Sequence, residues 1–400
     1  MRTAYKVRIY PTHEQAAVLN RTFGCVRLVW NTVLAWRHAR YRTEGVTTSY
    51  AQSDRYLTEL KRDGGHDFLY EISSVPLQQA LRHQYTAFAN FFAGRARYPR
   101  FKSRHGRQSA TYTRSAFRWR DGRLWLAKMD EPLELVWSWA KIDLATLDPT
   151  TVTISRDPDG RWYACLAVET EAEPEPVPAA GSAVGVDLGV KDFAVTSVGQ
   201  RIANPRHLER RAHNLARYQR RMARKQRGSN NRAKAKAKVA RAHTKVRDAR
   251  ADFLHKTTSR LVRDHDLIVI EDLNVKGMVR NRHLARVISD CGWGEFRRQL
   301  EYKTRRYGRH LIVVDRWYPS SKTCSACGHL LAELSLSTRH WTCPDCGTRH
   351  DRDVNAAKNI LAAGRAVSAC GADVSHSGSS RVRSAVKQEA QPVRAGIPRL

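Results

Sequence analysis

The chain contains 400 residues, of which 70 are lysine or arginine and 38 are aspartate or glutamate, giving a formal net charge of +32. A charge of this size favours a polyanion as the partner, either nucleic acid or an anionic membrane surface. The membrane is disfavoured because no stretch approaches the roughly 18 consecutive apolar residues of a spanning helix, and the first residues lead into no apolar signal core. We therefore expect a nucleic-acid-binding protein in a reducing compartment, long enough for two or three domains.

The N-terminal region predicts one strand followed by helices. Residues 5–9 alternate between apolar and basic side chains, as in a half-buried strand. Thr12 and Gln15 then form a capping box before a long stretch with apolar residues at helical spacing. A further helix is expected from about 76 to 92, so helices should occupy much of 12–105.

A segment in which cations and aromatic rings interleave follows that helix. It can neutralise phosphates while its rings stack on bases, or it can be a solvated basic loop whose Tyr98 and Phe101 are tucked into the core. Gln78 and Gln79 can read adenine, but they can equally be ordinary residues of a helix surface. The candidate nucleic-acid contacts of this region are Gln78, Arg97, Tyr98, Arg100, Phe101 and Lys102.

Short alternating runs between 109 and 168 predict a small β subdomain. One hairpin is expected to turn at Asp159 and Gly160. The stretch 171–180 is rich in proline and glutamate and has the composition of a linker. We therefore place a domain boundary near residue 181.

Two apolar strands in the second half of the chain each contain a carboxylate. Asp187 interrupts one strand, and Glu271 ends the other. An ionised carboxylate in a buried strand is costly unless it is paired or binds a metal ion. A third acid lies at the start of a helix, within 351–360. Each acid alone could be a cap, a turn residue or half of an ion pair, but together they can converge on two divalent cations about 3.5–4 Å apart and promote phosphodiester hydrolysis.

A basic helical hairpin is expected between these strands, at about 205–227 and 232–263. Apolar residues recur every seventh position on both helices and predict a packed seam. The seam consists of Leu208, Leu215, Met222, Val239, Val246 and Phe253. The cationic outer faces can form one wall of a nucleic-acid channel, or they can simply be solvated. The candidate contacts on these faces include Arg220, Arg221, Arg224 and Lys225.

Four cysteines form a C-x2-C-x15-C-x2-C array. They are Cys324, Cys327, Cys343 and Cys346. Two such pairs can hold one zinc ion in a closed tetrahedral site, so the metal is expected to be structural. The alternatives are four unrelated thiols or two disulfides. The remaining cysteines, Cys25, Cys165, Cys291 and Cys370, are expected to be buried or incidental thiols.

The motifs around these residues resemble the TnpB (OrfB-type) proteins of bacterial and archaeal insertion sequences, relatives of the type V CRISPR effectors. The resemblance rests on Val-Gly-Val-Asp-Leu-Gly around Asp187, Ile-Glu-Asp-Leu-Asn around Glu271, both cysteine pairs, and Asp-Arg-Asp-Val-Asn-Ala-Ala at 351–357. The Tyr-Pro motifs near residues 10 and 98 extend it over nearly the whole chain.

The resemblance implies an α/β and α+β multidomain protein. A RuvC-like nuclease domain of the RNase H fold, with an inserted zinc ribbon, should follow a small β subdomain that carries an inserted helical recognition region. The expected domains are a wedge-like N-terminal part at 1–180, the first part of the RuvC-like domain at 181–317 with its basic hairpin at 205–263, the zinc ribbon at 318–350, the last part of the RuvC-like domain at 351–363, and a disordered tail at 364–400.

The resemblance also implies the site and its cofactors. Asp187, Glu271 and Asp353 match the family's catalytic acids and should hold magnesium, in two ions that manganese can replace, beside one structural zinc. Asp353 is preferred to Asp351 because the family's third acid stands in Asp-x-Asn.

The implied activity is RNA-guided DNA cleavage in the cytoplasm or nucleoid of a prokaryote. A noncoding guide RNA from the element end would pair with target double-stranded DNA, while one protein chain per RNA reads a short adjacent motif. The alternatives are a transposition accessory and an RNA-guided regulator that does not cut. No histidine-hydrophobe-histidine motif supports a transposase, and loss of an acid would have favoured the regulator, but all three are present.

Overall fold

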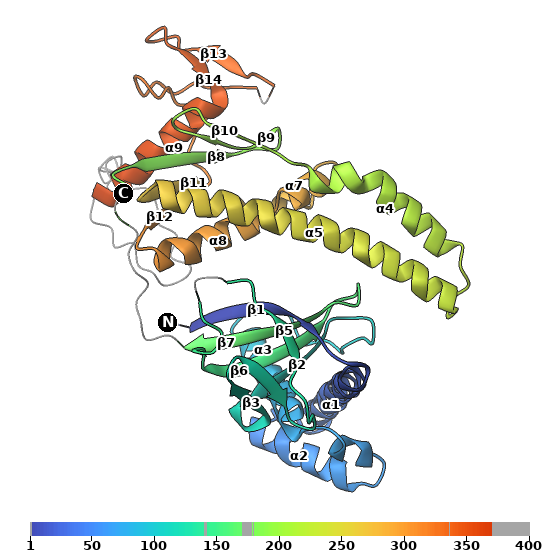
Figure 1. Cartoon of the computed structure of the whole chain (residues 1–400). Coiled ribbons are helices and arrows are strands. Elements are labelled where there is room, and N and C mark those ends of the chain that lie inside the picture. The colour runs from blue at the N-terminus through green and yellow to red at the C-terminus, as the bar shows by residue number, and fades with distance from the viewer. Residues whose placement is uncertain (1, 140–141, 170–177, 179, 336, 370–400) are drawn as a thin grey trace, which may run out of the picture. The chain divides into compact units, whose positions relative to one another are not determined.

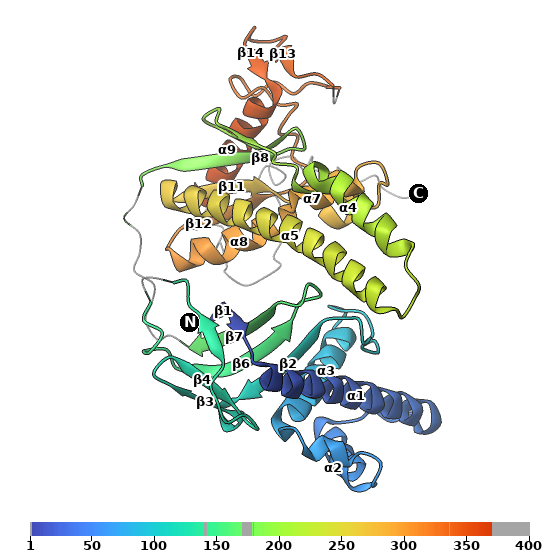
Figure 2. The same cartoon turned by 45° about the vertical axis from the view of Figure 1, so that its right-hand side comes forward.

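The computed structural model describes residues 2–139, 142–169, 178, 180–335 and 337–369. The chain divides into two compact units, Met1–Glu173 and Pro174–Leu400, each drawn in Figures 1 and 2. The first unit ends within the stretch predicted to be a linker, most of which lies outside the described residues. Within the described ranges, no helix has both the length and the apolar character needed to cross a membrane.

The first unit is built on an antiparallel sheet with the strand order β2-β6-β7-β1-β5. Its strands are β1 (Arg2–Tyr10), β2 (Gln108–Thr113), β5 (Glu134–Val136), β6 (Pro149–Arg156) and β7 (Trp162–Glu169), with a separate hairpin of β3 (Phe117–Arg120) and β4 (Arg123–Leu126). Tyr5, Val7 and Ile9 of β1 are buried, and β6 pairs with β7 across the turn at Gly160, so both sequence predictions are confirmed.

The helices of the first unit are α1 (His13–Glu44), α2 (Tyr50–Arg62) and α3 (Ser74–Phe92), with 3-10 turns η1 (Asp67–Tyr70) and η2 (Arg114–Ala116). The predicted capping box is present, because Thr12 Oγ1 accepts from Gln15 N while Gln15 Oε1 accepts from Thr12 N. Apolar residues of α1 and α3 share one core with the sheet.

The second unit contains a mixed sheet with the strand order β10-β9-β8-β11-β12. Its strands are β8 (Ala183–Leu188), β9 (Asp192–Thr196), β10 (Arg201–Ala203), β11 (Leu267–Glu271) and β12 (His310–Val314). β8, β11 and β12 are parallel, whereas β9 and β10 are antiparallel to their neighbours.

Helices cover both faces of this sheet (Figures 1 and 2). Val184, Val186 and Ile270 pack against α5 (Asn230–Asp264) and α8 (Trp293–Arg306). The alternate residue Val269 faces α9 (Arg352–Ala369), where it packs against Ile360. Strand side chains alternate between the two faces of a sheet. Asp187 of β8 and Glu271 of β11 come one position after Val186 and Ile270, so both are directed to the α9 side.

The remaining elements are α4 (His207–Ala223), the short helices α6 (Val275–Met278) and α7 (Ala285–Cys291), and a small ribbon of β13 (His340–Thr342) and β14 (Arg349–Asp351). α4 and α5 form the predicted hairpin, although the loop between them is longer than expected. All six seam residues are buried or half-buried.

The expected end of the nuclease domain at residue 363 is wrong, because α9 continues to Ala369. Gly364 is buried and lies against Val269 of β11, so contact with the sheet supports the helix beyond its last strongly apolar residues. Residues 364–369 are therefore helical, and the remainder of the predicted tail, from 370, lies outside the described residues.

Candidate active site

The register of the parallel strands brings Asp187 and Glu271 together. Val186 of β8 pairs with Ile270 of β11, so the two acids occupy the next position on adjacent strands, about 4.8 Å apart in the sheet. Side chains at matching positions of parallel strands project to the same face. Both carboxylates therefore lie at the carboxyl edge of the sheet, on the face covered by α9.

Asp353 reaches the same place through the close packing of α9 on β8. The carbonyl oxygen of Ala357 lies directly over Gly185. Asp353 precedes Ala357 by four residues, about one helical turn or 6 Å, and Asp187 follows Gly185 by two residues, about 6.6 Å along the strand. The first turn of α9 thus lies above Asp187, in agreement with the electrostatic effect of Asp353 on that group.

The three carboxylates are crowded and partly removed from water. Burial, followed by the charges of Glu271 and Asp353, raises the pKa of Asp187 to about 8, although Arg352 acts in the opposite direction. Burial also raises the pKa of Glu271, against a hydrogen bond from Ser320. Among the described residues only the cysteine tetrad brings three or more ligand atoms within 4.8 Å of one another, so the acids are near one another without forming a closed metal site. Carboxylate oxygens are nevertheless the ligands of hard divalent cations, and the charge of such a cation would stabilise the ionised form of each acid.

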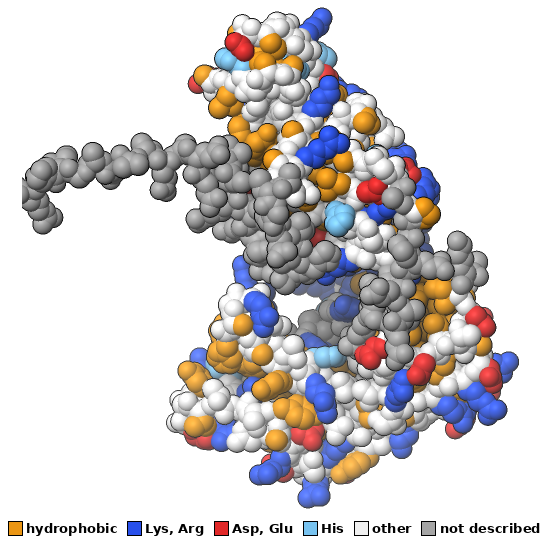
Figure 3. Space-filling view, turned by 90° about the vertical axis from the view of Figure 1, so that its left-hand side faces the viewer, with side chains coloured by type: hydrophobic (Ala, Val, Ile, Leu, Met, Phe, Trp, Pro, Cys, Tyr) orange, Lys and Arg blue, Asp and Glu red, His pale blue; other side chains and the backbone are white. Residues whose placement is uncertain are grey.

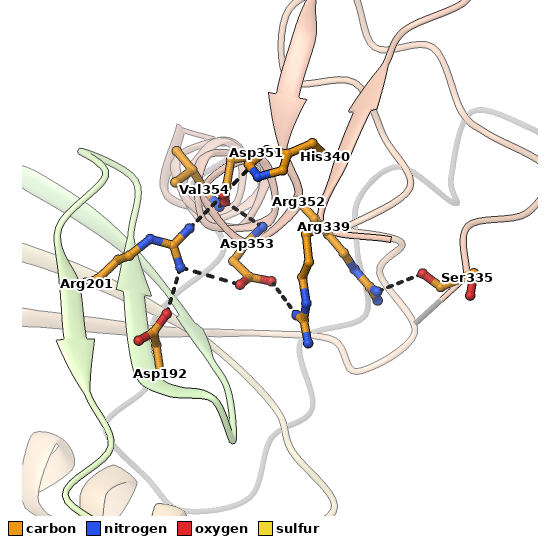
Figure 4. A network of polar contacts seen from close by, with 9 residues as sticks. All are labelled: Asp192, Arg201, Ser335, Arg339, His340, Asp351, Arg352, Asp353 and Val354. Carbon is orange, nitrogen blue, oxygen red and sulfur yellow. Dashed lines mark hydrogen bonds and ion pairs between the residues drawn. The ribbon is translucent and has the colours of Figure 1, made fainter. Parts of the chain in front are cut away.

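An arginine network holds the start of α9 beside β9 and β10 (Figure 4). Arg201 donates to Asp192 and to Asp351, each at 2.7 Å, and lies 3.7 Å from Asp353. Arg339 also lies 3.7 Å from Asp353. These two guanidinium groups moderate the repulsion among the acids without forming a short hydrogen bond to Asp353.

Asp351 caps the helix that carries Asp353. Its Oδ1 accepts hydrogen bonds from the backbone N–H groups of Asp353 and Val354, at 3.1 and 3.0 Å. A side chain that satisfies the first amides of a helix is an N-cap. Asp351 therefore has a structural role, which the sequence left unassigned, and of the two acids Asp353 has the larger electrostatic effect on the pKa of Asp187.

Glu271 and Asp272 are adjacent in sequence but differ in their partners. Arg297 Nη1 donates to Asp272 at 2.6 Å, and Arg316 also donates to it. Burial raises the pKa of Asp272, but the two arginines outweigh burial and lower it overall. Glu271 instead accepts one hydrogen bond, from Ser320 Oγ at 2.7 Å. Of the two acids, only Glu271 thus lacks an arginine among its described partners.

The four cysteines predicted to bind zinc converge in the ribbon. All four sulfur atoms lie within 4.8 Å of one another, and the pairs Cys324–Cys346 and Cys327–Cys343 are each 3.7 Å apart. These distances exclude disulfides, whose S–S bond is about 2.05 Å. They match the edge of a tetrahedron with bonds of about 2.3 Å, roughly 3.8 Å. The tetrad can therefore hold a zinc ion.

Two asparagines of α9 attach the cysteine module to this helix, which packs on the mixed sheet. Asn355 Nδ2 donates to the carbonyl oxygen of Thr323 at 2.7 Å, and Asn355 Oδ1 accepts from Ser325 N at 2.9 Å. One turn later, Asn359 donates to the carbonyl oxygens of Ser320 and Thr323. The sequence motif did not reveal this connection. The same segment contains Ser320, which donates a hydrogen bond to Glu271.

The predicted nucleic-acid contacts lie in different environments. Tyr98 packs edge-on against Phe88 and Phe91 with ring centroids 5.4 and 5.3 Å away but is still 42% exposed, and Phe101 is 60% exposed. Lys102 is half-buried over the ring of Trp30, and Gln78 and Gln79 are half-buried too. The charged candidates that are exposed are Arg97, Arg100, Arg220, Arg221, Arg224 and Lys225. In Figure 3, basic side chains are spread over the visible face of each unit.

Three family models match this chain. They are "Probable transposase" (OrfB_IS605) over residues 164–282, "Cas12f1-like, TNB domain" over 293–360, and "Helix-turn-helix domain" over 1–45. In the structure, the last of these regions forms strand β1 and the single long helix α1, rather than two helices joined by a turn.

Two relatives match almost from end to end. A Streptomyces pristinaespiralis protein named "Putative RNA-guided DNA endonuclease" is 54% identical, covering 100% of this chain and 99% of its own. An Escherichia coli K12 protein named "Putative RNA-guided DNA endonuclease InsQ" is 34% identical, covering 92% of this chain and 94% of its own.

Two solved structures share the fold at low identity. The protein in a Cas12f1–sgRNA–target DNA complex superposes with a TM-score of 0.56 and 15% identity, over 88% of this chain and 83% of that one. A mini-RNA-guided endonuclease, CRISPR-Cas phi3, superposes with a TM-score of 0.50 and 9% identity, over 90% of this chain and 92% of that one. The predicted fold class is confirmed by these likenesses together with the mixed sheet and the cysteine cluster.

Proposed function

The chain belongs to the TnpB (OrfB-type) family, and on that premise we propose that it is an RNA-guided DNA endonuclease that hydrolyses phosphodiester bonds at Asp187, Glu271 and Asp353. The observation that carries the proposal is the convergence of three partly buried carboxylates at one sheet edge, with the pKa of Asp187 raised by burial and by the other two acids. The names of the two end-to-end relatives agree with it.

The chain's own residues would hold the reacting groups in place. Asp187, Glu271 and Asp353 would bind two divalent cations, normally magnesium, which when bound activate water and stabilise the oxygens of the phosphodiester in displacement. Ser320 orients Glu271 through its hydrogen bond. Asp351 fixes the first turn of α9 and so the direction of Asp353.

The proposed partners are a noncoding guide RNA and double-stranded target DNA, with one protein chain per RNA. Support comes from the net charge of +32 and from the exposed arginines and lysine at 220–225 on the α4–α5 hairpin. Phosphates neutralised by such side chains release counterions, so binding should weaken steeply as salt rises. Pairing with the guide, rather than base contacts by the protein, would then select most of the target sequence.

The test has two parts, of which the first is sequencing of the RNA that copurifies with the protein expressed from its own locus. We expect one discrete RNA that ends in sequence from beyond the element boundary. The second part is magnesium-dependent cutting of a plasmid matched to that RNA by wild type, Asp187→Ala, Glu271→Gln and Asp353→Asn. The control is Asp252→Asn, which changes an exposed acid of α5 that pairs with Lys256.

The proposal predicts cutting by wild type and by the control, and none by the three site variants. Wild-type protein that carries a discrete RNA and binds the matched target, but fails to cut it whichever divalent metal is supplied, would instead be a guided regulator. A random mixture of cellular RNA would remove the guided part of the proposal and favour a transposition accessory role.

A further inference from the structure

Trp317 is the most exposed large apolar side chain among the described residues, with 82% of its surface open to solvent. It lies in the loop 315–320, which leads from β12 toward the first cysteine pair. A single exposed apolar residue is common and needs no function. Trp317 differs because the loop that carries it is fastened to the strand of the candidate active site.

The loop is anchored on both sides of Trp317 by Glu271, the last residue of β11, and by Asp272, which follows it. On one side, Arg316 donates a hydrogen bond to Asp272. On the other side, Ser320 Oγ donates to Glu271 Oε1 at 2.7 Å. The backbone N–H of Asp272 also donates to the carbonyl oxygen of Val314, where the loop begins. The position of the loop is therefore set by Glu271 and its neighbour.

The interior of the loop is equally constrained. Trp317 N donates to Asp315 Oδ1 at 2.8 Å, and Tyr318 N donates to the Asp315 carbonyl oxygen at 3.1 Å, which closes a turn. Tyr318 packs against the apolar cluster beneath α9, whereas its neighbour Trp317 is directed to solvent. The indole is thus presented on a backbone that is already ordered, so a stacking partner would cost little further backbone entropy.

We propose that Trp317 is a stacking platform for an unpaired base of the DNA strand that is cut, an inference that rests on the proposed nuclease function. Ser320 follows Trp317 by three positions, which span at most about 10 Å of extended chain. That length corresponds to about three nucleotides at roughly 3.4 Å each along a strand. The base would therefore lie within about three nucleotides of the phosphate at the acids.

Stacking suits this position because it does not depend on base identity. Every base offers a π-face, whereas hydrogen-bond readout would select particular sequences. An enzyme whose target is chosen by pairing with a guide must accept any sequence at its cutting site. An exposed indole beside the acids would hold the strand there without adding its own sequence preference.

The experiment is a cycle that combines protein and DNA changes in the full-length protein with its copurified RNA. Single abasic positions are placed within about three nucleotides of the mapped cut, and single-turnover cleavage is measured. We expect one abasic position to slow wild type about tenfold, and Trp317→Ala to slow cutting of intact DNA by a similar factor. The two changes together should cost no more than either alone, because they remove the same contact.

Trp317→Phe keeps an aromatic face and should restore most of the rate, whereas Trp317→Leu should not. Leu330→Ala is the matched control, since it truncates another exposed apolar side chain, 56% exposed, in the cysteine module. Binding of the whole target should be unchanged in all variants, because guide pairing dominates it. Fully additive losses at every abasic position, or equal rates for Trp317→Ala and wild type, would overturn the inference.

A second readout does not need cutting. In the Asp187→Ala background, target DNA with 5-iodouracil at each position near the cut is irradiated, and crosslinked peptides are identified. A crosslink to Trp317 supports the platform even if wild type never cleaves, in which case only the nuclease proposal fails. Cleavage by wild type with no crosslink and no abasic effect retains the nuclease and removes the platform.

Discussion

The carbonyl oxygen of Ala357 lies so near Gly185 that a Cβ atom on the glycine would come within 2.1 Å of it. Because of this close approach, the first turn of α9, which carries Asp353, lies over the carboxyl end of β8, which carries Asp187. The missing side chain of Gly185 is thus a condition for assembling the acids.

Gly185→Ala should destabilise the protein and abolish cutting, because the added methyl group collides with backbone and α9 must move outward. Overpacking of this kind typically costs about 1–3 kcal/mol in the free energy of unfolding. Gly294→Ala in α8 is the control, since a Cβ there meets nothing within 4 Å and should stabilise the helix by about 0.5–1 kcal/mol. Thermal unfolding and plasmid cleavage check both; a stable, active Gly185→Ala would refute the packing argument.

Asp351 and Asp353 should respond differently to substitution. Asp351→Asn keeps an N-capping oxygen and should retain stability and part of the activity, whereas Asp351→Ala should lose about 1 kcal/mol with the cap. Asp353→Asn should fold normally and not cut. Chemical denaturation and single-turnover cleavage of the three variants distinguish these effects. If Asp353→Asn were active and Asp351→Asn inactive, Asp351 rather than Asp353 would be the third acid of the site.

The raised pKa of Asp187 predicts how the stability of the metal-free protein depends on pH. Its pKa is about 8 in the folded chain and about 3.9 when unfolded, so the folded state binds the extra proton between these values. The free energy of unfolding should therefore fall as pH rises from about 4 to 8. Asp187→Asn should lack this contribution and be more stable than wild type at pH 9 in chelator. Thermal unfolding at pH 6 and 9 measures the difference, and a parallel response of both proteins would contradict it.

The same pKa predicts a pH dependence of metal binding. A divalent cation displaces the proton from Asp187, so affinity should increase up to about pH 8 and then level off. Calorimetric titration with manganese at several pH values checks this, and Asp187→Asn should bind far more weakly throughout.

Cys343→Ser should remove zinc and also slow DNA cutting. Cys343 is buried in the tetrad, and the backbone on either side of Cys324, at Thr323 and Ser325, is hydrogen-bonded to Asn355 and Asn359 of α9. Loss of the ion should loosen this segment and, through Ser320, the orientation of Glu271. Metal analysis, unfolding and cleavage are compared with Cys165→Ser, a thiol of β7 outside the tetrad. Unchanged zinc content in Cys343→Ser would rule out the four-thiolate site.

Arg220→Gln with Arg221→Gln should make binding less sensitive to salt. If both side chains neutralise phosphates, the log–log slope of affinity against salt should decrease by about 0.9 for each on duplex DNA, or about 0.7 on single strands. Lys256→Gln on α5 is the control, because that exposed lysine is already paired with Asp252 at 2.8 Å. An unchanged slope would mean that the hairpin surface is only solvated.

Local patterns in the sequence determined the elements and the identity of the chemical groups. Alternation in β1, the Thr12–Gln15 capping box, the seam of the α4–α5 hairpin and the cysteine spacing all depend on residues close in the chain. The preference for Asp353 over Asp351 as the third acid came from the family resemblance and stays a prediction, with which the capping hydrogen bonds of Asp351 agree.

The tertiary structure alone decided how these groups meet, because the relevant contacts join segments far apart in the chain. The parallel register of Val186 with Ile270, the approach of Ala357 to Gly185 and the bond from Ser320 to Glu271 leave no periodic signal in the sequence. The same holds for the end of α9, which sheet contacts extend past residue 363. Local periodicity encodes which side chains are buried, whereas long-range packing decides which of them touch.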